Sequence, residues 1–147
     1  MNLERYDTKV TEDALTFEFT SIGPKGEIHK IVVYQHIEGN IFNLAFGDLN
    51  GEIRSIDDLI VSDNKDTEKV LATVASTIFD FFSVYSGTLV LAKGSTQSRT
   101  RLYRRYLTIF LEYIDQEFLL FGELDEEIER FESGKDYTAF YISKKIK

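Results

Sequence analysis

The first third of the chain has the alternation of apolar and polar residues that is typical of β-strands. The apolar side chains of Leu15, Phe17 and Phe19 fall on one face of such a strand. A segment with a β-branched centre follows the turn-forming residues 23–26, and then another alternating segment. These segments predict an antiparallel meander of three strands. The predicted strands span residues 15–20, 27–37 and 41–46.

The rest of the chain combines two helical patterns with further short strands. Apolar residues recur every three or four positions from Val70 to Tyr85, and Gly87 follows, as is common after a helix C-terminus. This helix is predicted to begin near Asp63 or Asp66. A second helix is predicted after Gly94, with an apolar face from Leu102 to Ile114. Strands are predicted at 57–62, 88–92, 117–122 and 137–143, a loop at 47–51, and a hairpin tip or helical turn at 123–132.

This order of elements predicts an α+β fold in one domain, residues 1–147. A strand, a helix and another strand imply a parallel crossover in the middle of the chain. The remainder favours a mostly antiparallel, curved sheet of about six to seven strands, with two long helices packed against it. Residues 1–14 are polar and mixed, and we expect them to form a flexible arm.

Composition narrows the classes of function. The chain has no cysteine, which excludes disulfides, thiolate metal sites and a cysteine nucleophile. His29 and His36 are seven residues apart in one predicted strand, so they point to opposite faces and no metal site is expected. No nucleophile elbow, Walker phosphate-binding loop or dinucleotide fingerprint is present, so no catalytic residue and no cofactor are predicted. Without a signal segment or a membrane-spanning run, a cytoplasmic protein is expected.

The distribution of charge singles out one segment. The formal net charge is −8, which disfavours nucleic acid or anionic lipid as a partner of the whole surface. Residues 93–105 nevertheless contain five lysines and arginines and no acid. A glycine turn, hydroxyl side chains, the free N–H groups of a helix start and nearby cations are the groups that bind phosphate or carboxylate. The predicted ligand-binding residues are Lys93, Gly94, Ser95, Thr96, Arg99, Arg101 and Tyr103. The alternative is a capped helix with surface arginines.

The same stretch carries a resemblance to known proteins. Ala92-Lys-Gly-Ser-Thr96 followed by Arg99-Thr-Arg-Leu-Tyr103 resembles the signature of a family of small, functionally uncharacterised bacterial proteins. The resemblance extends through residues 19–26, 43–48 and 66–74, so it covers most of the chain. It implies relatives but no activity.

A more distant resemblance concerns the order of the elements. Strands, a long helix, a strand, a helix bearing Leu102-Tyr103 and two more strands are similar to the acetyl-CoA-dependent N-acetyltransferase fold. In that fold a glycine-containing turn binds the cofactor pyrophosphate at the start of the first of these helices. The equivalent turn here, residues 62–67, has no glycine and two acids, which argues against acyl-CoA at the usual place.

Three functions follow as hypotheses. The leading one is a binding domain for an anionic ligand, either a phosphate-bearing metabolite or a nucleic-acid backbone, at residues 93–101. The second is an N-acetyltransferase-like enzyme in which Tyr103 acts as general acid and a displaced cofactor uses the 93–99 turn. The third is a protein-interaction module of the toxin–antitoxin type, whose basic helix docks an acidic surface such as segment 123–132 of another copy. The sequence leaves the oligomeric state open.

Overall fold

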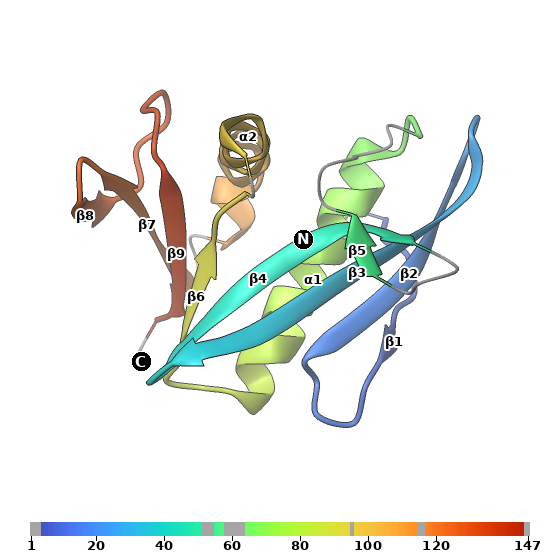
Figure 1. Ribbon diagram of the computed structural model, residues 1–147, viewed down its shortest axis with the longest axis horizontal. Coiled ribbons are helices and arrows are strands. Elements are labelled where there is room, and N and C mark those ends of the chain that lie inside the picture. Colours follow the sequence, from blue (N-terminus) through green and yellow to red (C-terminus); the bar gives the residue numbers. More distant parts are fainter. Residues whose placement is uncertain (1–3, 51–54, 58–63, 95, 115–116, 146–147) are drawn as a thin grey trace.

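The computed structural model describes residues 4–50, 55–57, 64–94, 96–114 and 117–145, and Figure 1 shows their arrangement. The described part of the chain contains two helices of 18 residues each and nine strands. The helices are α1 (Thr67–Val84) and α2 (Gln97–Ile114). The strands are β1 (Lys9–Val10), β2 (Thr16–Gly23), β3 (Gly26–Glu38), β4 (Ile41–Asn50), β5 (Ser55–Asp57), β6 (Leu89–Ala92), β7 (Phe118–Leu124), β8 (Glu127–Arg130) and β9 (Ala139–Lys144).

All of these strands belong to one mixed sheet. Eight of them lie in the order β1-β2-β3-β4-β6-β9-β7-β8, and β5 pairs with the end of β4 outside this order. The pairing of β4 with β6 is parallel, and every other described pair is antiparallel. The parallel pair joins only Ile41–Leu44 to Leu89–Ala92, after which the two strands diverge (Figure 1). The predicted α+β class, the meander and the parallel crossover are therefore confirmed.

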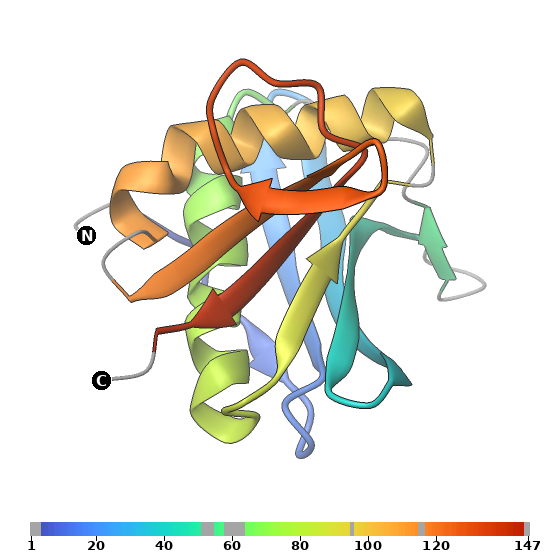
Figure 2. The ribbon, with the colours of Figure 1, turned by 90° about the vertical axis from the view of Figure 1, so that its left-hand side faces the viewer.

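The sheet curves around α1, which lies in its concave face (Figures 1 and 2). Phe81 of α1 stacks on Tyr34 of β3 at a centroid distance of 4.3 Å, while Phe82 lies 5.4 Å from Phe118 of β7. One helix thus contacts strands from both halves of the sheet, and its side chains are buried on several sides. This aromatic packing is the main apolar core, as the abundance of phenylalanine and tyrosine predicts.

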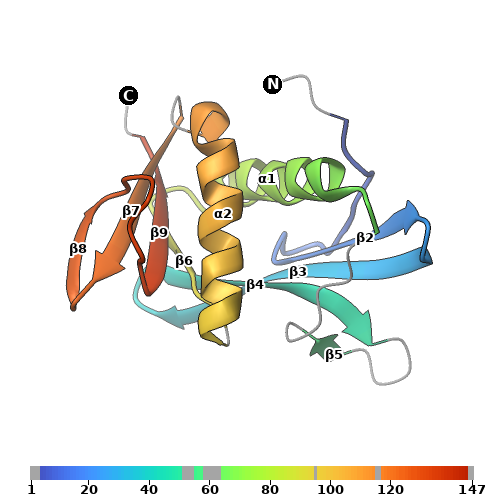
Figure 3. The same ribbon diagram turned by 90° about the horizontal axis from the view of Figure 1, so that it is seen from above.

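Helix α2 crosses above α1 at a steep angle (Figure 3). Tyr103 anchors it, because this side chain is buried in the core cluster and its hydroxyl donates to the Phe46 carbonyl at 3.4 Å. Gln97, Arg101 and Arg105 are exposed on another face of the helix. Neither helix in the described part of the chain has the length and apolar character needed to span a membrane.

Two predictions near the end of β4 need correction. Residues 47–50 are not a loop, because β4 continues through them to Asn50. Gly47 is buried opposite Ile31, and the Asp48 carboxylate accepts a bond from the buried Lys30 ammonium at 2.6 Å. The short strand predicted at 57–62 is observed at Ser55–Asp57, and residues 58–62 lie outside the described residues.

The strand count is also higher than predicted. The strands β2, β3, β4, β6, β7 and β9 match predicted strands, whereas β1 and β8, of two and four residues, carry little periodicity. β8 lies in the acidic segment 123–132, for which a hairpin tip or a helical turn was predicted. The segment forms a hairpin with β7. β1 lies in the predicted arm, where Tyr6 stacks on Phe19 with ring centroids 5.8 Å apart.

Candidate functional site

The predicted anion site lies where β6 passes into α2. Val90 and Ala92 are buried in the sheet, β6 ends at Ala92, and the helix begins at Gln97. The buried Thr100 links Gly94 to Thr96. Its hydroxyl accepts a bond from the Gly94 N–H at 3.2 Å and donates to the Thr96 carbonyl at 3.2 Å. The Gly94 N–H is therefore engaged inside the protein and is not a donor to a ligand.

Thr100 was not among the predicted residues, although a signal for it exists. A threonine four residues after a turn residue commonly bonds back to that residue's carbonyl. The Thr100 N–H also donates to the Thr96 carbonyl, at 3.0 Å, which is the first helical bond of the segment. The N–H groups of residues 97–99 precede this bond and have no partner within the helix.

The predicted side chains divide into three groups. Lys93, Thr96 and Arg101 are exposed at the turn. Tyr103 is in the core and does not line the surface there. Ser95 and the Arg99 side chain lie outside what the structure describes, so their predicted contributions are not placed.

A depression of about 290 Å³ opens beside these exposed residues. Four of the predicted site residues line it, and the loop between β8 and β9 forms its other wall. The lining residues are Lys93, Gly94, Thr96, Gln97, Thr100, Arg101, Asp136, Tyr137 and Thr138. No local pattern indicates this wall, because 35 or more positions separate it from the α2 residues that it faces.

The wall is held firmly by its own contacts. The Tyr137 hydroxyl donates to the Glu129 carboxylate at 2.9 Å and accepts the Glu132 N–H at 3.0 Å. Burial, together with the Glu129 carboxylate, raises the pKa of Tyr137. A Cβ on Gly122 would come within 2.4 Å of the Tyr137 ring, so glycine is required for this packing. Thr138 bonds the Glu123 carbonyl through its N–H and its hydroxyl.

The charged side chains that line the depression differ in whether they form ion pairs. Among the residues that the structure describes, neither Lys93 nor Arg101 forms an ion pair; Arg101 contacts only the Ser98 hydroxyl, at 3.4 Å. Asp136 is paired with Arg104 at 3.0 Å. The first turn of α2 contains no acid. The helix start thus keeps a positive potential, to which an exposed anion is attracted.

The start of α1 is occupied by the protein's own groups. The Asp66 carboxylate accepts bonds from the Ser21 hydroxyl at 2.6 Å and the Tyr6 hydroxyl at 2.5 Å. Asn64 is 1% exposed; its amide donates to the Gly26 carbonyl at 2.9 Å, and its side-chain oxygen accepts the Lys25 N–H at 2.7 Å. The Asp66 side chain makes no capping bond to the helix, but its charge and that of Glu68 disfavour an anion at this helix start.

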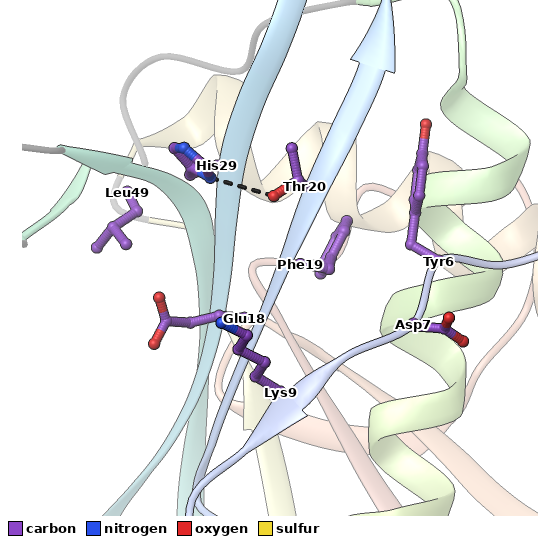
Figure 4. A pocket seen from close by; sticks show the side chains of 8 residues that line it. All are labelled: Tyr6, Asp7, Lys9, Glu18, Phe19, Thr20, His29 and Leu49. Atoms are coloured by element: carbon purple, nitrogen blue, oxygen red, sulfur yellow. Dashed lines mark hydrogen bonds between the residues drawn. The ribbon is translucent and has the colours of Figure 1, made fainter.

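A larger depression, of about 540 Å³, lies at the β1 end of the sheet (Figure 4). It wraps around the edge of β2, since Phe19 faces α1 while Glu18 and Thr20 face the other side. The Thr20 hydroxyl is already bonded to His29 Nδ1 at 3.1 Å, and side chains of both charges line the surface. It contains none of the predicted ligand-binding residues and has no uniform chemistry.

The histidines are placed as predicted. His29 and His36 lie on opposite faces of β3, and His36 Nε2 contacts the Gly39 carbonyl at 2.8 Å. No group of three metal-ligating side chains occurs within the described ranges of the chain.

Comparison with known proteins gives a family but no activity. No curated protein and no solved structure matches the chain. Residues 2–145 match the model of a family described as a family of unknown function (DUF6934). Because this match spans nearly the whole sequence, the chain belongs to the DUF6934 family.

Proposed function

We propose that this protein is a binding domain for a small phosphate-bearing anion, held in the depression at the start of α2. The observation that carries the proposal is the combination of Lys93 and Arg101 around one small depression. Both cations are exposed, and neither is neutralised by a carboxylate of the described chain. Charge-assisted bonds from such groups to phosphate oxygens are the strong ones in protein recognition.

The backbone adds donors to the same place. The N–H groups of residues 97–99 lack helical partners, and the macrodipole of an 18-residue helix places partial positive charge there. Thr96 is exposed beside them. A volume of about 290 Å³ is near the lower limit for ligand sites, which favours a metabolite over a macromolecule.

The test is an amide-resolved NMR titration with methyl phosphate. We expect saturable shifts concentrated at residues 94 and 96–101. Lys93→Ala and Arg101→Ala should each weaken binding by about 1 kcal/mol, or about fivefold in Kd. Arg105→Ala is the matched control, because Arg105 is exposed on the same helix but does not line the depression. Absence of saturable shifts, or an equal loss with Arg105→Ala, would refute the site.

A second candidate, an N-acetyltransferase-like transferase, is favoured by one feature of the sheet. The order β2-β3-β4-β6-β9-β7, with a parallel β4–β6 pair that diverges, resembles that fold. Fold resemblance alone does not carry chemistry. The contacts of Asn64 and Asp66 oppose a cofactor at the start of α1, and Tyr103, the proposed general acid, is 8% exposed.

Coenzyme A distinguishes the two candidates in the same NMR assay. Shifts at residues 94–101 that extend along Ala45–Gly47, where β4 leaves β6, would support the transferase. Shifts that match those of methyl phosphate would support a phosphate site without acyl chemistry. No shift with millimolar coenzyme A would remove the transferase from consideration.

A further inference from the structure

One wall of the depression bears a negative charge opposite its cations. Asp136 lines the same surface as Lys93 and Arg101, although it comes from the loop between β8 and β9. A site for a simple anion gains nothing from a carboxylate at its rim, because like charges repel. The position of Asp136 therefore bears on what kind of anion fits.

Arg104 holds this carboxylate in place. The Arg104 guanidinium, whose side chain is 28% exposed, donates to Asp136 Oδ1 at 3.0 Å and to the Lys135 carbonyl at 3.0 Å. Asp136 itself is 64% exposed, and its other oxygen, Oδ2, has no partner among the residues that the structure describes. One oxygen is thus fixed, and the second is available to a donor in the depression.

We infer that the ligand of this site is zwitterionic: a phosphate monoester that carries an ammonium or a similar donor close to its phosphate, with Asp136 as the specificity-determining residue. This inference rests on the proposed function, since Lys93 and Arg101 take the phosphate. The ammonium group donates to the free oxygen of Asp136. A nucleic-acid backbone, which carries a phosphate at each residue and no cation, would instead place charge against this carboxylate.

Two phosphate monoesters of nearly equal size test the inference. 2-Aminoethyl phosphate is ethyl phosphate in which an ammonium group replaces one hydrogen of the terminal methyl. For the wild-type protein we expect 2-aminoethyl phosphate to bind between about two- and fivefold more tightly, the range of an exposed ion pair. Asp136→Asn keeps the shape and the bond from Arg104, and should bring the ratio of the two Kd values to about one.

Asp125→Asn is the matched control, because it removes the same charge from an exposed loop outside the depression. It should leave the preference unchanged. If ethyl phosphate binds but 2-aminoethyl phosphate is not preferred, or if the preference survives Asp136→Asn, the zwitterion inference is wrong while the phosphate site stands. If ethyl phosphate does not bind at all, both fail together. Tighter binding of a single-stranded oligonucleotide than of either ester would overturn the small-ligand assignment.

Discussion

The contact between the N-terminal segment and α1 can be tested by removing one oxygen atom, with Tyr6→Phe. The Tyr6 hydroxyl donates to the Asp66 carboxylate at 2.5 Å and accepts the Ile22 N–H at 3.1 Å. Burial and the bond to Asp66 raise the pKa of Tyr6, so the hydroxyl keeps the proton that it donates. Phenylalanine preserves the ring that stacks on Phe19 and lies under the Lys69 ammonium, so the substitution removes only the hydroxyl contacts.

The size of the effect follows from the surroundings. A hydrogen bond to a charged group contributes about 1.5 to 3 kcal/mol, and the lower end applies because Tyr6 and Asp66 are only half-buried. The Ile22 N–H is exposed and can bond water, so its loss adds little. We therefore expect the free energy of unfolding to fall by about 1.5 kcal/mol.

Urea unfolding followed by circular dichroism measures this change. With a slope of about 2 kcal/mol per molar urea, the midpoint should fall by about 0.7 M. Tyr85→Phe is the matched control: its hydroxyl donates to the exposed Asp13 carbonyl at 2.6 Å, a neutral acceptor, and its loss should cost about 0.5 kcal/mol. In an Asp66→Asn background, Tyr6→Phe should cost less than in the wild type. An unchanged midpoint for Tyr6→Phe, or an equal cost in both backgrounds, would refute the role assigned to the bond.

Three further predictions concern residues that do not themselves line the depression at the start of α2. Glu126→Gly should raise the free energy of unfolding by about 1 kcal/mol, since Glu126 has a φ of +66° in the β7–β8 turn; a thermal midpoint that does not rise would contradict this. Gly122→Ala should lower the free energy of unfolding by about 3 kcal/mol, as in overpacked cores, because its Cβ would overlap the Tyr137 ring. A urea midpoint near that of the wild type would show that the loop moves to make room. Burial raises the pKa of Tyr34, so the neutral side chain is favoured in the folded state. The free energy of unfolding should therefore stay constant with respect to this group below about pH 10 and fall as the pH rises further. Absorbance at 295 nm should show that more tyrosines ionise in the urea-unfolded protein than in the folded one at high pH, and Tyr34→Phe should reduce that difference by one tyrosine.

Local periodicity was sufficient to predict the longer elements of this fold. The strands containing Phe17, Val32 and Leu44 have alternating or β-branched patterns, and both helices have continuous apolar faces. The error at residues 47–50 arose because Gly47 and Asp48 have the composition of a loop. Their pairing with β3, in which Asp48 lies opposite Lys30, 18 residues earlier, makes a strand of them.

Only the part of the candidate site that consists of residues close together in the sequence could be predicted. Lys93 and Arg101 are near in sequence and share a turn, so their proximity was accessible from spacing alone. The opposite wall depends on Gly122, which admits the Tyr137 ring, and on Arg104, which fixes Asp136. These are tertiary contacts between residues far apart in the chain, and no periodic pattern indicates them.

The N-termini of α1 and α2 differ in whether nearby acids compensate the partial positive charge of the helix dipole. At α1 the chain places its own acids, Asp66 before the helix and Glu68 in the first turn, so the partial positive charge there is already compensated. An acid in the first turn is worth about 0.3 to 1 kcal/mol to a helix. At α2 the first turn has no acid, and Lys93 and Arg101 add positive charge to the dipole. An anion bound at the start of α2, as we propose, would supply the missing stabilisation, whereas at the start of α1 it would meet two acids of the chain itself.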